Sequence, residues 1–248
     1  MDKKIGFYFT ICLFLAKGLS SQSLTGITGL MNAPSANFEK DGTFYMGANF
    51  INKEYIKTYT DGQFDCIVYY FDLTFLPFLE INYRNTRMLG NSNDHHHTVD
   101  RSFSGKFRLL KERKYLPAIA IGANDPATTA NSGNQYFSAA YIVASKNFEW
   151  RKNRLGGTLG WAYPAFRNNL FAGLFGGVTF NPAFYKQLTF MAEYDSRTFN
   201  VGASVFLFKH LYLFALLQGM RELGGGLSFK MRMYSGFKGM LSKKEFLQ

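Results

Sequence analysis

Hydrophobic and polar positions alternate along most of the chain, most clearly in the stretch Asp100–Asp125. Phe103, Phe107 and Leu109 share one face of an extended segment, and serine, lysine and arginine side chains share the other. This period of two predicts a strand with one apolar and one polar side. A short charged turn, Lys111–Lys114, leads into a second alternating arm, so the stretch predicts a β-hairpin.

The same alternation recurs along the chain and predicts about twelve strands. The expected strands outside the hairpin are Thr43–Phe50, Phe64–Phe75, Leu79–Met88, Tyr136–Phe148, Leu155–Tyr163, Ala172–Phe180, Gln187–Asp195, Phe199–Leu207, Leu211–Gly219 and Gly224–Met233. The connections between them alternate between short and long in the first part of the chain, as they do in barrels of bacterial outer membranes. We therefore expect an all-β fold, an antiparallel transmembrane β-barrel; a count of ten or fourteen strands stays open.

The first residues differ from the rest of the chain. Lys3 and Lys4 precede the apolar run Ile5–Ala16, and small residues follow it before Gln22. This order predicts a signal peptide over residues 1–21, and the run is too short to span a bilayer as a helix. Residues 22–42 are irregular and rich in small side chains, which makes them a candidate plug. The barrel is expected over residues 43–233 and a basic tail over 234–248.

Composition fits an exported barrel with a basic surface. Aromatic residues make up 18% of the chain, with 15 Tyr and 27 Phe, as expected for aromatic girdles. Without the three lysines and one aspartate of residues 1–21, the net charge falls from +11 to +9. Export makes nucleic acid an unsuitable partner, so anionic lipid headgroups or an anionic polymer remain. Cys66 is then the single cysteine, which excludes an internal disulfide.

Strand alternation also predicts which charged side chains face the lumen. The two open interpretations are ion pairs that brace a narrow lumen and a binding surface or pathway for an anionic or hydroxyl-rich polymer. The predicted lumen residues are Glu80, Arg84, Lys106, Arg108, Lys146, Glu193, Asp195, Lys230 and Arg232.

Catalytic and metal chemistry have weak signals. His95, His96 and His97 follow Asp94, but adjacent side chains on an extended loop point in alternating directions and no cysteine or carboxylate cluster completes a site. Serines such as Ser102 lack a nucleophile signature, and no nucleotide-binding motif is present. We expect no catalytic residues, no metal site, no cofactor and no enzymatic activity.

Several short motifs carry a resemblance to a known family. In order and rough spacing, the chain resembles the YjbH-like outer-membrane proteins of bacteria, in a single-barrel short form. The motifs are Gly29–Ala36 with Asp41 and Gly42, Asp100–Ser102 with Lys106, Ala120–Asp125, Tyr141–Lys146, Gly160 with Trp161, and Ala192–Asp195 with Asn200. The resemblance implies an outer-membrane β-barrel, of a family whose members are often encoded with machinery for exopolysaccharide production, and a role in exporting or assembling a surface polysaccharide.

The expected function is therefore that of a non-enzymatic barrel in the bacterial outer membrane that takes part in export or assembly of an exopolysaccharide. Its expected partners are outer-membrane lipid, an anionic or hydroxyl-rich polysaccharide and envelope proteins of polysaccharide export. Three alternatives stay open: a small general porin or structural barrel, a lipid-modifying outer-membrane enzyme, and a soluble secreted β-protein.

Overall fold

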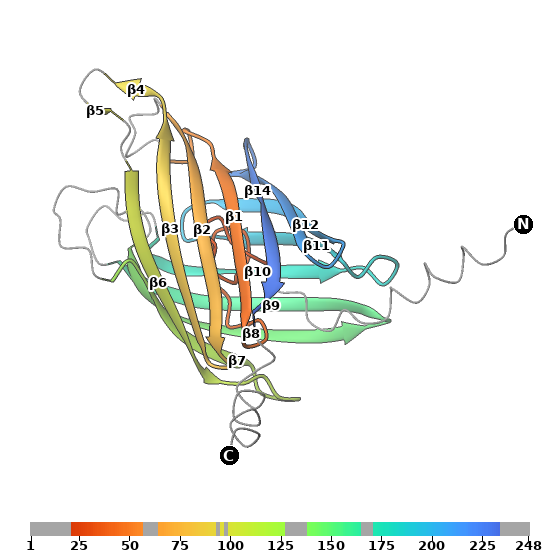
Figure 1. The fold of residues 1–248 in the computed structure, drawn as a ribbon. Coiled ribbons are helices and arrows are strands. Elements are labelled where there is room, and N and C mark those ends of the chain that lie inside the picture. The colour runs from red at the N-terminus through yellow and green to blue at the C-terminus, as the bar shows by residue number, and fades with distance from the viewer. Residues whose placement is uncertain are drawn as a thin grey trace, which may run out of the picture.

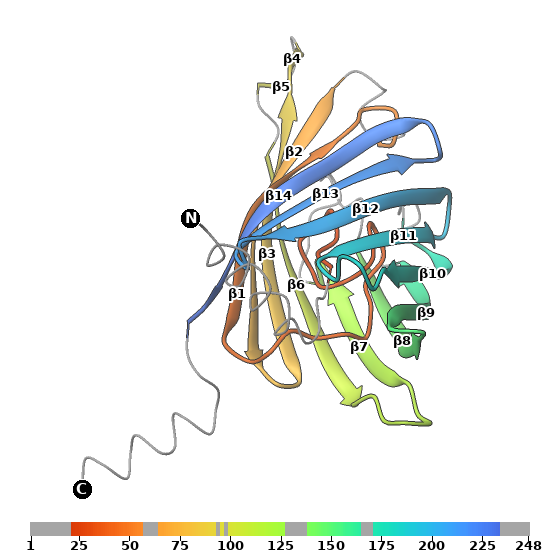
Figure 2. The ribbon, with the colours of Figure 1, turned by 90° about the vertical axis from the view of Figure 1, so that its right-hand side faces the viewer.

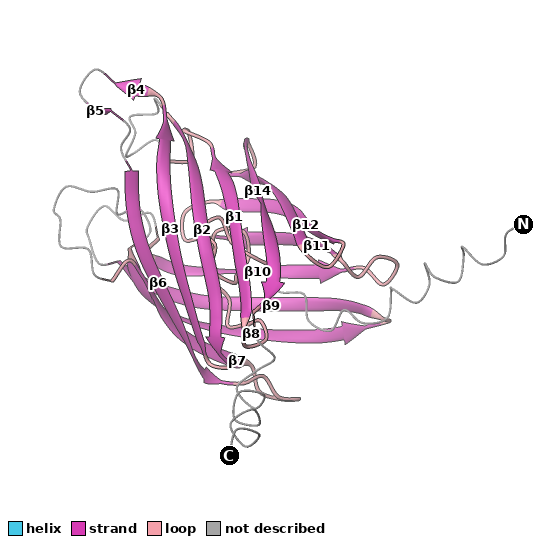
Figure 3. Ribbon diagram, in the orientation of Figure 1, coloured by secondary structure: helices cyan, strands magenta, loops and turns pink. Residues whose placement is uncertain are grey.

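The computed structural model describes residues 21–56, 64–92, 95–96, 99–126, 138–164 and 171–233. Their secondary structure consists of strands joined by turns and loops (Figure 3). Within these ranges, no helix is long and apolar enough to cross a membrane. The predicted signal peptide and the predicted basic tail lie outside the described residues.

Twelve antiparallel strands close into a barrel, which confirms the predicted fold class (Figure 1). Around the barrel, the order is β1, β14, β13, β12, β11, β10, β9, β8, β7, β6, β3 and β2. The barrel strands are β1 Thr43–Ile51, β2 Asp65–Leu76, β3 Leu79–Leu89, β6 Val99–Leu110, β7 Ala118–Asn124, β8 Ala139–Trp150, β9 Asn153–Pro164, β10 Gly173–Asn181, β11 Leu188–Tyr194, β12 Phe199–Leu207, β13 Leu211–Gln218 and β14 Glu222–Arg232. The short strands β4 Asn91–Ser92 and β5 His95–His96 pair with each other in the β3–β6 connection.

The outer face of the barrel is apolar and aromatic. On the neighbouring strands β3 and β6, the rings of Tyr83 and Phe103 lie 4.9 Å apart between centroids. The ring of Phe78, in the turn before β3, lies 5.3 Å from that of Phe107 on β6. Further exposed apolar side chains on this face include Met46, Phe71, Ile81, Ile121, Ile142, Leu159, Trp161, Leu174, Val178, Phe190 and Leu227. This surface matches the hydrocarbon-facing side of a membrane barrel.

The two ends of the barrel differ in their connections. At one end, here called the short-turn end, the strands are joined by residues 77–78, 111–117, 151–152, 182–187 and 208–210. The other end, here called the long-loop end, carries the longer connections 52–64, 90–98 and 125–138, together with the short connections 195–198 and 219–221. In outer-membrane barrels, the short turns face the periplasm and the longer loops face outward.

The segment before β1 lies inside the barrel. Residues 21–38, here called the inner segment, fold into two small turns in the lumen, where the red ribbon occupies the interior in Figure 2. Every side chain from Ser21 to Ala36 is buried. Internal backbone bonds, such as that from the Leu24 N–H to the Met31 carbonyl at 2.7 Å, hold the turns together. The segment pairs with no barrel strand, so its other backbone groups need side-chain partners.

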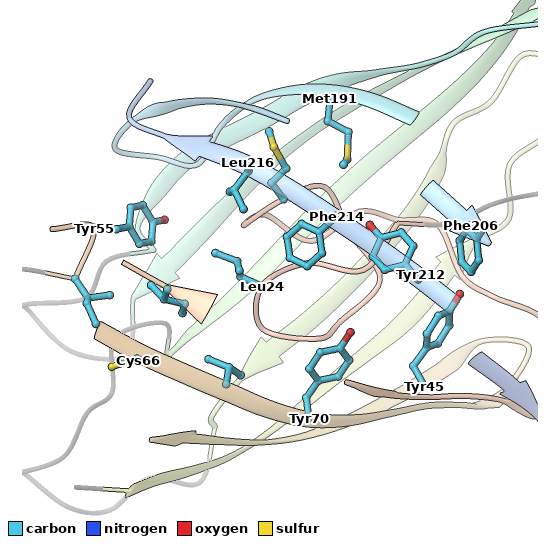
Figure 4. Close-up of a cluster of buried hydrophobic side chains, with 14 residues drawn as sticks. Leu24, Tyr45, Tyr55, Cys66, Tyr70, Met191, Phe206, Tyr212, Phe214 and Leu216 are labelled. Carbon is cyan, nitrogen blue, oxygen red and sulfur yellow. The ribbon is translucent and has the colours of Figure 1, made fainter. Parts of the chain in front are cut away.

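The inner segment joins two apolar clusters that line the lumen. Leu24 and Met31 belong to one cluster, which also contains Tyr70 of β2 and Phe214 of β13 and is drawn in Figure 4. Leu30, Ala33 and Ala36 belong to the other, with Tyr141 of β8 and Phe175 of β10 among their neighbours. The segment therefore supplies part of the apolar core that the barrel walls bury.

One predicted strand had its two faces exchanged. In the strand expected at Tyr136–Phe148, the prediction that Lys146 faces the lumen places Tyr141 and Val143 on the outer face by alternation. Instead both are buried in the lumen, and Ile142 is exposed. The physical reason is that both faces of β8 are apolar at this point, so alternation alone gave no preference. The wall accommodates Tyr141 because Gly122 on the neighbouring strand leaves space: a Cβ there would lie 2.3 Å from the Tyr141 Oη.

Candidate functional site

Polar side chains from the walls bind the backbone of the inner segment. Glu80 of β3 and Lys106 of β6 are register partners and form a buried ion pair, with 2.8 Å between Lys106 Nζ and Glu80 Oε2. The Thr28 N–H donates to Glu80 Oε1 at 2.6 Å, and the Thr28 carbonyl accepts from Lys106 Nζ at 2.8 Å. Lys106 Nζ also donates to the Asn37 carbonyl at 3.0 Å. The pair thereby fastens the inner segment to the wall at two points.

A second carboxylate binds the inner segment from the opposite wall. Glu193 of β11 accepts the backbone N–H groups of Met31 at 2.9 Å, Asn32 at 2.7 Å and Ala33 at 3.4 Å. Asn200 of β12 donates to the same carboxylate at 3.3 Å. Successive N–H groups converging on one anion satisfy buried backbone donors that no strand pairing reaches.

Asp195 ties the long-loop end to the inner segment. Its Oδ2 accepts from the Tyr55 hydroxyl at 2.6 Å, from Asn32 Nδ2 at 3.1 Å and from Asn200 Nδ2 at 2.9 Å. Arg197 donates to the Tyr55 carbonyl at 3.1 Å and lies over the Tyr55 ring. Burial, and next the neighbouring Asp195, raise the pKa of Tyr55 well above its ordinary value. Residues of the β1–β2 connection thus cover the inner segment at this end.

The remaining predicted lumen residues fall into distinct places. Arg84 is buried on β3 and donates from Nη2 to Ser102 Oγ at 3.4 Å. Lys230 of β14 pairs with Glu39 at 2.7 Å, just after the inner segment. Arg232 is exposed at the last residue of β14, so it lies beyond the lumen.

Lys146 does not face the lumen as we predicted. Its neighbours Ser145 and Asn147 are the inward side chains at this point of β8, and Lys146 lies on the outward face. There its Nζ lies 3.3 Å from Glu112 Oε1 of the β6–β7 turn and also bonds the Arg113 carbonyl. The error has the same origin as the exchanged faces of β8.

A cavity of about 340 Å³ lies at the short-turn end, between the inner segment and the wall formed by β6 to β11. Three basic side chains line it: Arg108 of β6, Lys111 of the following turn and Arg154 of β9. Of these, only Arg108 was predicted to face the lumen. Its guanidinium carbon lies 4.3 Å from the centre of the Phe38 ring, so the inner segment holds this side chain in place.

The negative charge of Glu112, the one acidic side chain that lines the cavity, is balanced by Lys146. Glu112 accepts from the backbone N–H of Asn147 at 2.8 Å and from Asn147 Nδ2 at 2.7 Å, in addition to its pair with Lys146. Partial burial opposes the charged form, but these hydrogen bonds outweigh it and lower the pKa of Glu112. Across the described residues, no acidic group lies within ion-pair distance of Arg108, Lys111 or Arg154, so the cavity carries a positive excess.

Sequence reasoning missed several residues of these sites. Thr28 acts through its backbone N–H and carbonyl, and Asn32 acts through its backbone N–H as well as its side-chain amide; backbone groups leave no signal in an amino-acid pattern. Arg154 lies two residues before the inward position Gly156 in its strand, so strand alternation could have found it. Tyr55 lies in a connection, where no periodicity indicates burial.

The histidine motif and metal binding gain no further support. The structure places His95 and His96 in β5, while their side chains and His97 fall outside what it describes. Within the described ranges, no group of three or more histidine, cysteine, aspartate or glutamate side chains is arranged to hold a metal ion.

The chain is similar to proteins of known sequence and structure. It is 29% identical over 158 residues to the uncharacterized lipoprotein YjbH of Escherichia coli K12, a match that covers 60% of this chain and 20% of that protein. The chain thus spans about a fifth of that relative's length. Among solved structures, outer membrane phospholipase A from E. coli covers 77% of this chain and 92% of its own, with a TM-score of 0.37 and 11% identity. The calcium-bound phospholipase dimer of Salmonella typhi gives a TM-score of 0.40, 13% identity, and coverage of 77% of this chain and 90% of its own.

A family described as exopolysaccharide biosynthesis protein YbjH matches residues 21–205. The matched region begins with the inner segment and extends into β12. The match covers well over half of the chain and agrees with the motifs found in the sequence. The chain belongs to the YjbH family.

Proposed function

We propose that this chain is a non-enzymatic barrel of the bacterial outer membrane that takes part in the export or assembly of a surface exopolysaccharide. The family match carries the proposal, because that family is described by exopolysaccharide biosynthesis and the match includes both the inner segment and most of the barrel. The apolar outer face and the closed antiparallel sheet support a place in the membrane, where every strand needs a partner.

The filled lumen favours a closed assembly component over an open conduit. A general porin needs a water-filled channel. Here residues 21–36 of the inner segment are buried, and Glu80, Lys106 and Glu193 bind the segment from two sides of the barrel. Withdrawing it would leave these buried charged groups without their backbone partners, at a cost of several kcal/mol. We therefore propose that the inner segment stays in place and that the polysaccharide contacts the short-turn end.

The proposed partners follow from this placement. Lipid covers the apolar outer face, and the basic short-turn end receives an anionic or hydroxyl-rich polysaccharide. Envelope proteins of polysaccharide export would meet the same end, which faces the periplasm in the orientation typical of such barrels.

The first test is a deletion strain in which surface polysaccharide is quantified. We expect less polysaccharide, restored by the wild-type chain, with unchanged lipid composition. An unchanged polysaccharide layer contradicts the proposed role. Altered lipid A or phospholipid with normal polysaccharide supports a lipid-modifying enzyme instead.

A disulfide can test whether the inner segment stays in place. The Ala36 N–H donates to Ser145 Oγ at 2.9 Å, so the two residues are in contact and are suitable positions at which to test a disulfide between the segment and β8. We expect the oxidised Ala36→Cys/Ser145→Cys variant to restore polysaccharide as well as either single variant does. Loss of function that appears on oxidation and disappears on reduction would show that the segment moves, and would contradict a closed component.

A further inference from the structure

We infer that the cavity at the short-turn end binds a carboxylated stretch of polysaccharide, a short run of uronic-acid sugars. The inference that the ligand is a polysaccharide rests on the proposed function, whereas its preference for acidic sugars rests on the side chains that line the cavity. A volume of about 340 Å³ falls at the lower end of the range of small-ligand pockets, which suits a few sugar units entering from the open side.

The charges of the cavity select an anion. Arg108 and Arg154 come from different strands and Lys111 from the connecting turn, and all three contribute to one lining. Glu112 is engaged by Lys146 and Asn147, so it does not cancel them. Guanidinium groups bind carboxylates through paired hydrogen bonds, which favours carboxylated sugars over neutral ones.

The neutral lining side chains suit hydroxyl groups. Thr158, Thr179 and Asn181 line the same cavity from β9 and β10. Asn181 uses its Nδ2 to donate to the Leu188 carbonyl at 3.0 Å and to Thr189 Oγ1 at 2.6 Å, which fixes the amide and leaves its oxygen as an acceptor. A lining of hydroxyl and amide groups around basic side chains can bind the hydroxyl groups and the carboxylate of one sugar together.

The inner segment completes the site rather than merely filling the barrel. Phe38 lies under the Arg108 guanidinium, and Ser35 to Phe38 form one side of the cavity. Because Lys106 and Ser145 bind this part of the segment at Asn37 and Ala36, its position relative to the basic side chains is fixed by the walls. The fastening of the segment and the binding of polymer are therefore parts of one structure.

Binding can be measured on the purified chain in detergent micelles by isothermal titration. The probes are oligogalacturonate and a neutral maltooligosaccharide of the same length. The test variant is Arg108→Gln/Arg154→Gln. The matched control is Arg113→Gln/Lys114→Gln, which removes the same charge from exposed side chains of the neighbouring turn that do not line the cavity. Heat-dependent gel migration verifies that each variant is folded. A further variant, Arg154→Lys, keeps the positive charge but lacks the guanidinium group.

We expect the affinity of the wild-type chain for oligogalacturonate to be at least about tenfold higher than its affinity for the neutral probe. The test variant should lose about tenfold or more in affinity, Arg154→Lys should lose less, and the control variant should stay within about twofold. Equal affinity for both probes, or an equal loss in the test and control variants, overturns the inference.

The two proposals fail in different experiments. Absence of acidic-sugar binding in a chain whose deletion lowers surface polysaccharide overturns the cavity assignment and leaves the proposed function intact. Selective binding that is lost in the test variant supports the assignment even where the deletion strain keeps its polysaccharide, and then the proposed function is the one that fails.

Discussion

The carboxylate of Glu193 on β11 accepts the backbone N–H of Asn32 at 2.7 Å, across 161 residues of sequence. The bond lies inside the barrel and joins a regular wall to an irregular segment. Side chains of the barrel wall supply hydrogen bonds to the backbone of the inner segment, as neighbouring strands do for the backbone of a strand in a sheet. Each contact between a wall side chain and the inner segment can be removed by a single substitution.

Replacing Glu193 should loosen the inner segment. In Glu193→Ala, the N–H groups of Met31 and Asn32 lose their acceptor while they stay buried, which costs about 1–3 kcal/mol for each group. We expect the free energy of unfolding, measured with urea in lipid vesicles, to fall by at least about 2 kcal/mol. The control Glu149→Ala removes an exposed glutamate of β8 and should stay within about 0.5 kcal/mol of wild type. Equal stability of the two variants would contradict the assignment.

The buried pair of Glu80 and Lys106 should show strong coupling. Removing one partner leaves the other charge buried, so Glu80→Gln or Lys106→Met alone should each cost about 3–5 kcal/mol. The double variant should cost less than the sum of the two, by at least about 1 kcal/mol. A double-mutant cycle on urea unfolding measures the difference.

The partly exposed pair of Glu112 and Lys146 serves as the control for that cycle. Its coupling energy should stay below about 1 kcal/mol because solvent screens it. A coupling at Glu80 and Lys106 as small as that of the control pair would mean that the inner segment does not depend on the ion pair.

Two glycines separate backbone strain from crowding. Gly26 and Gly219 both have positive φ, at 87° and 57°, so alanine should strain the backbone at either position. At Gly26, a Cβ would also lie 2.3 Å from the Tyr70 ring, whereas at Gly219 the nearest atom lies 3.9 Å away. We expect Gly219→Ala to cost about 1 kcal/mol and Gly26→Ala clearly more. The stabilities of the two variants can be compared by the temperature at which the folded band disappears from a gel. Equal temperatures would contradict the packing of the inner segment against β2.

High pH should weaken the long-loop end through Tyr55. Its folded pKa is raised above the ordinary value of 10.0, so the protonated phenol contributes stability in full below that pH. That contribution is lost as the pH rises from 10.0 through the folded pKa. The free energy of unfolding of wild type should therefore fall between about pH 9 and pH 11 by more than that of Tyr55→Phe. Tyr163→Phe, which removes an exposed hydroxyl, should behave as wild type. An equal fall in Tyr55→Phe and wild type would contradict the burial of the Tyr55 hydroxyl.

Strand alternation predicted the barrel well wherever one face was strongly apolar. Along β3, Ile81 and Tyr83 mark the outer face, and the structure buries Glu80 and Arg84 on the opposite face. The alternation failed on β8, where Tyr141 faces inward against Phe175 while Ile142 faces outward. Two apolar faces carry no periodic signal, so tertiary packing decided between them.

The inner segment had no comparable signal. Its small residues form no period, and its partners Glu80 and Glu193 lie 52 and 161 residues from the backbone groups that they bind. Such contacts depend on the register of the barrel strands and on the direction of backbone groups. The residue types in a sequence reveal neither of these. The pairing of Glu80 with Lys106, by contrast, follows once β3 and β6 are set in register.

The position of the inner segment has a consequence for the order of assembly. The segment leaves the ribosome before any strand, yet the carboxylate that binds Met31 arrives 162 residues later, on β11. We therefore expect the segment to gain this partner only once β11 is part of the sheet, and the pairing of β1 with β14 closes the barrel around it. Joining such distant parts is slow because chain entropy opposes it. We expect the sheet to close around the inner segment in one late, cooperative step.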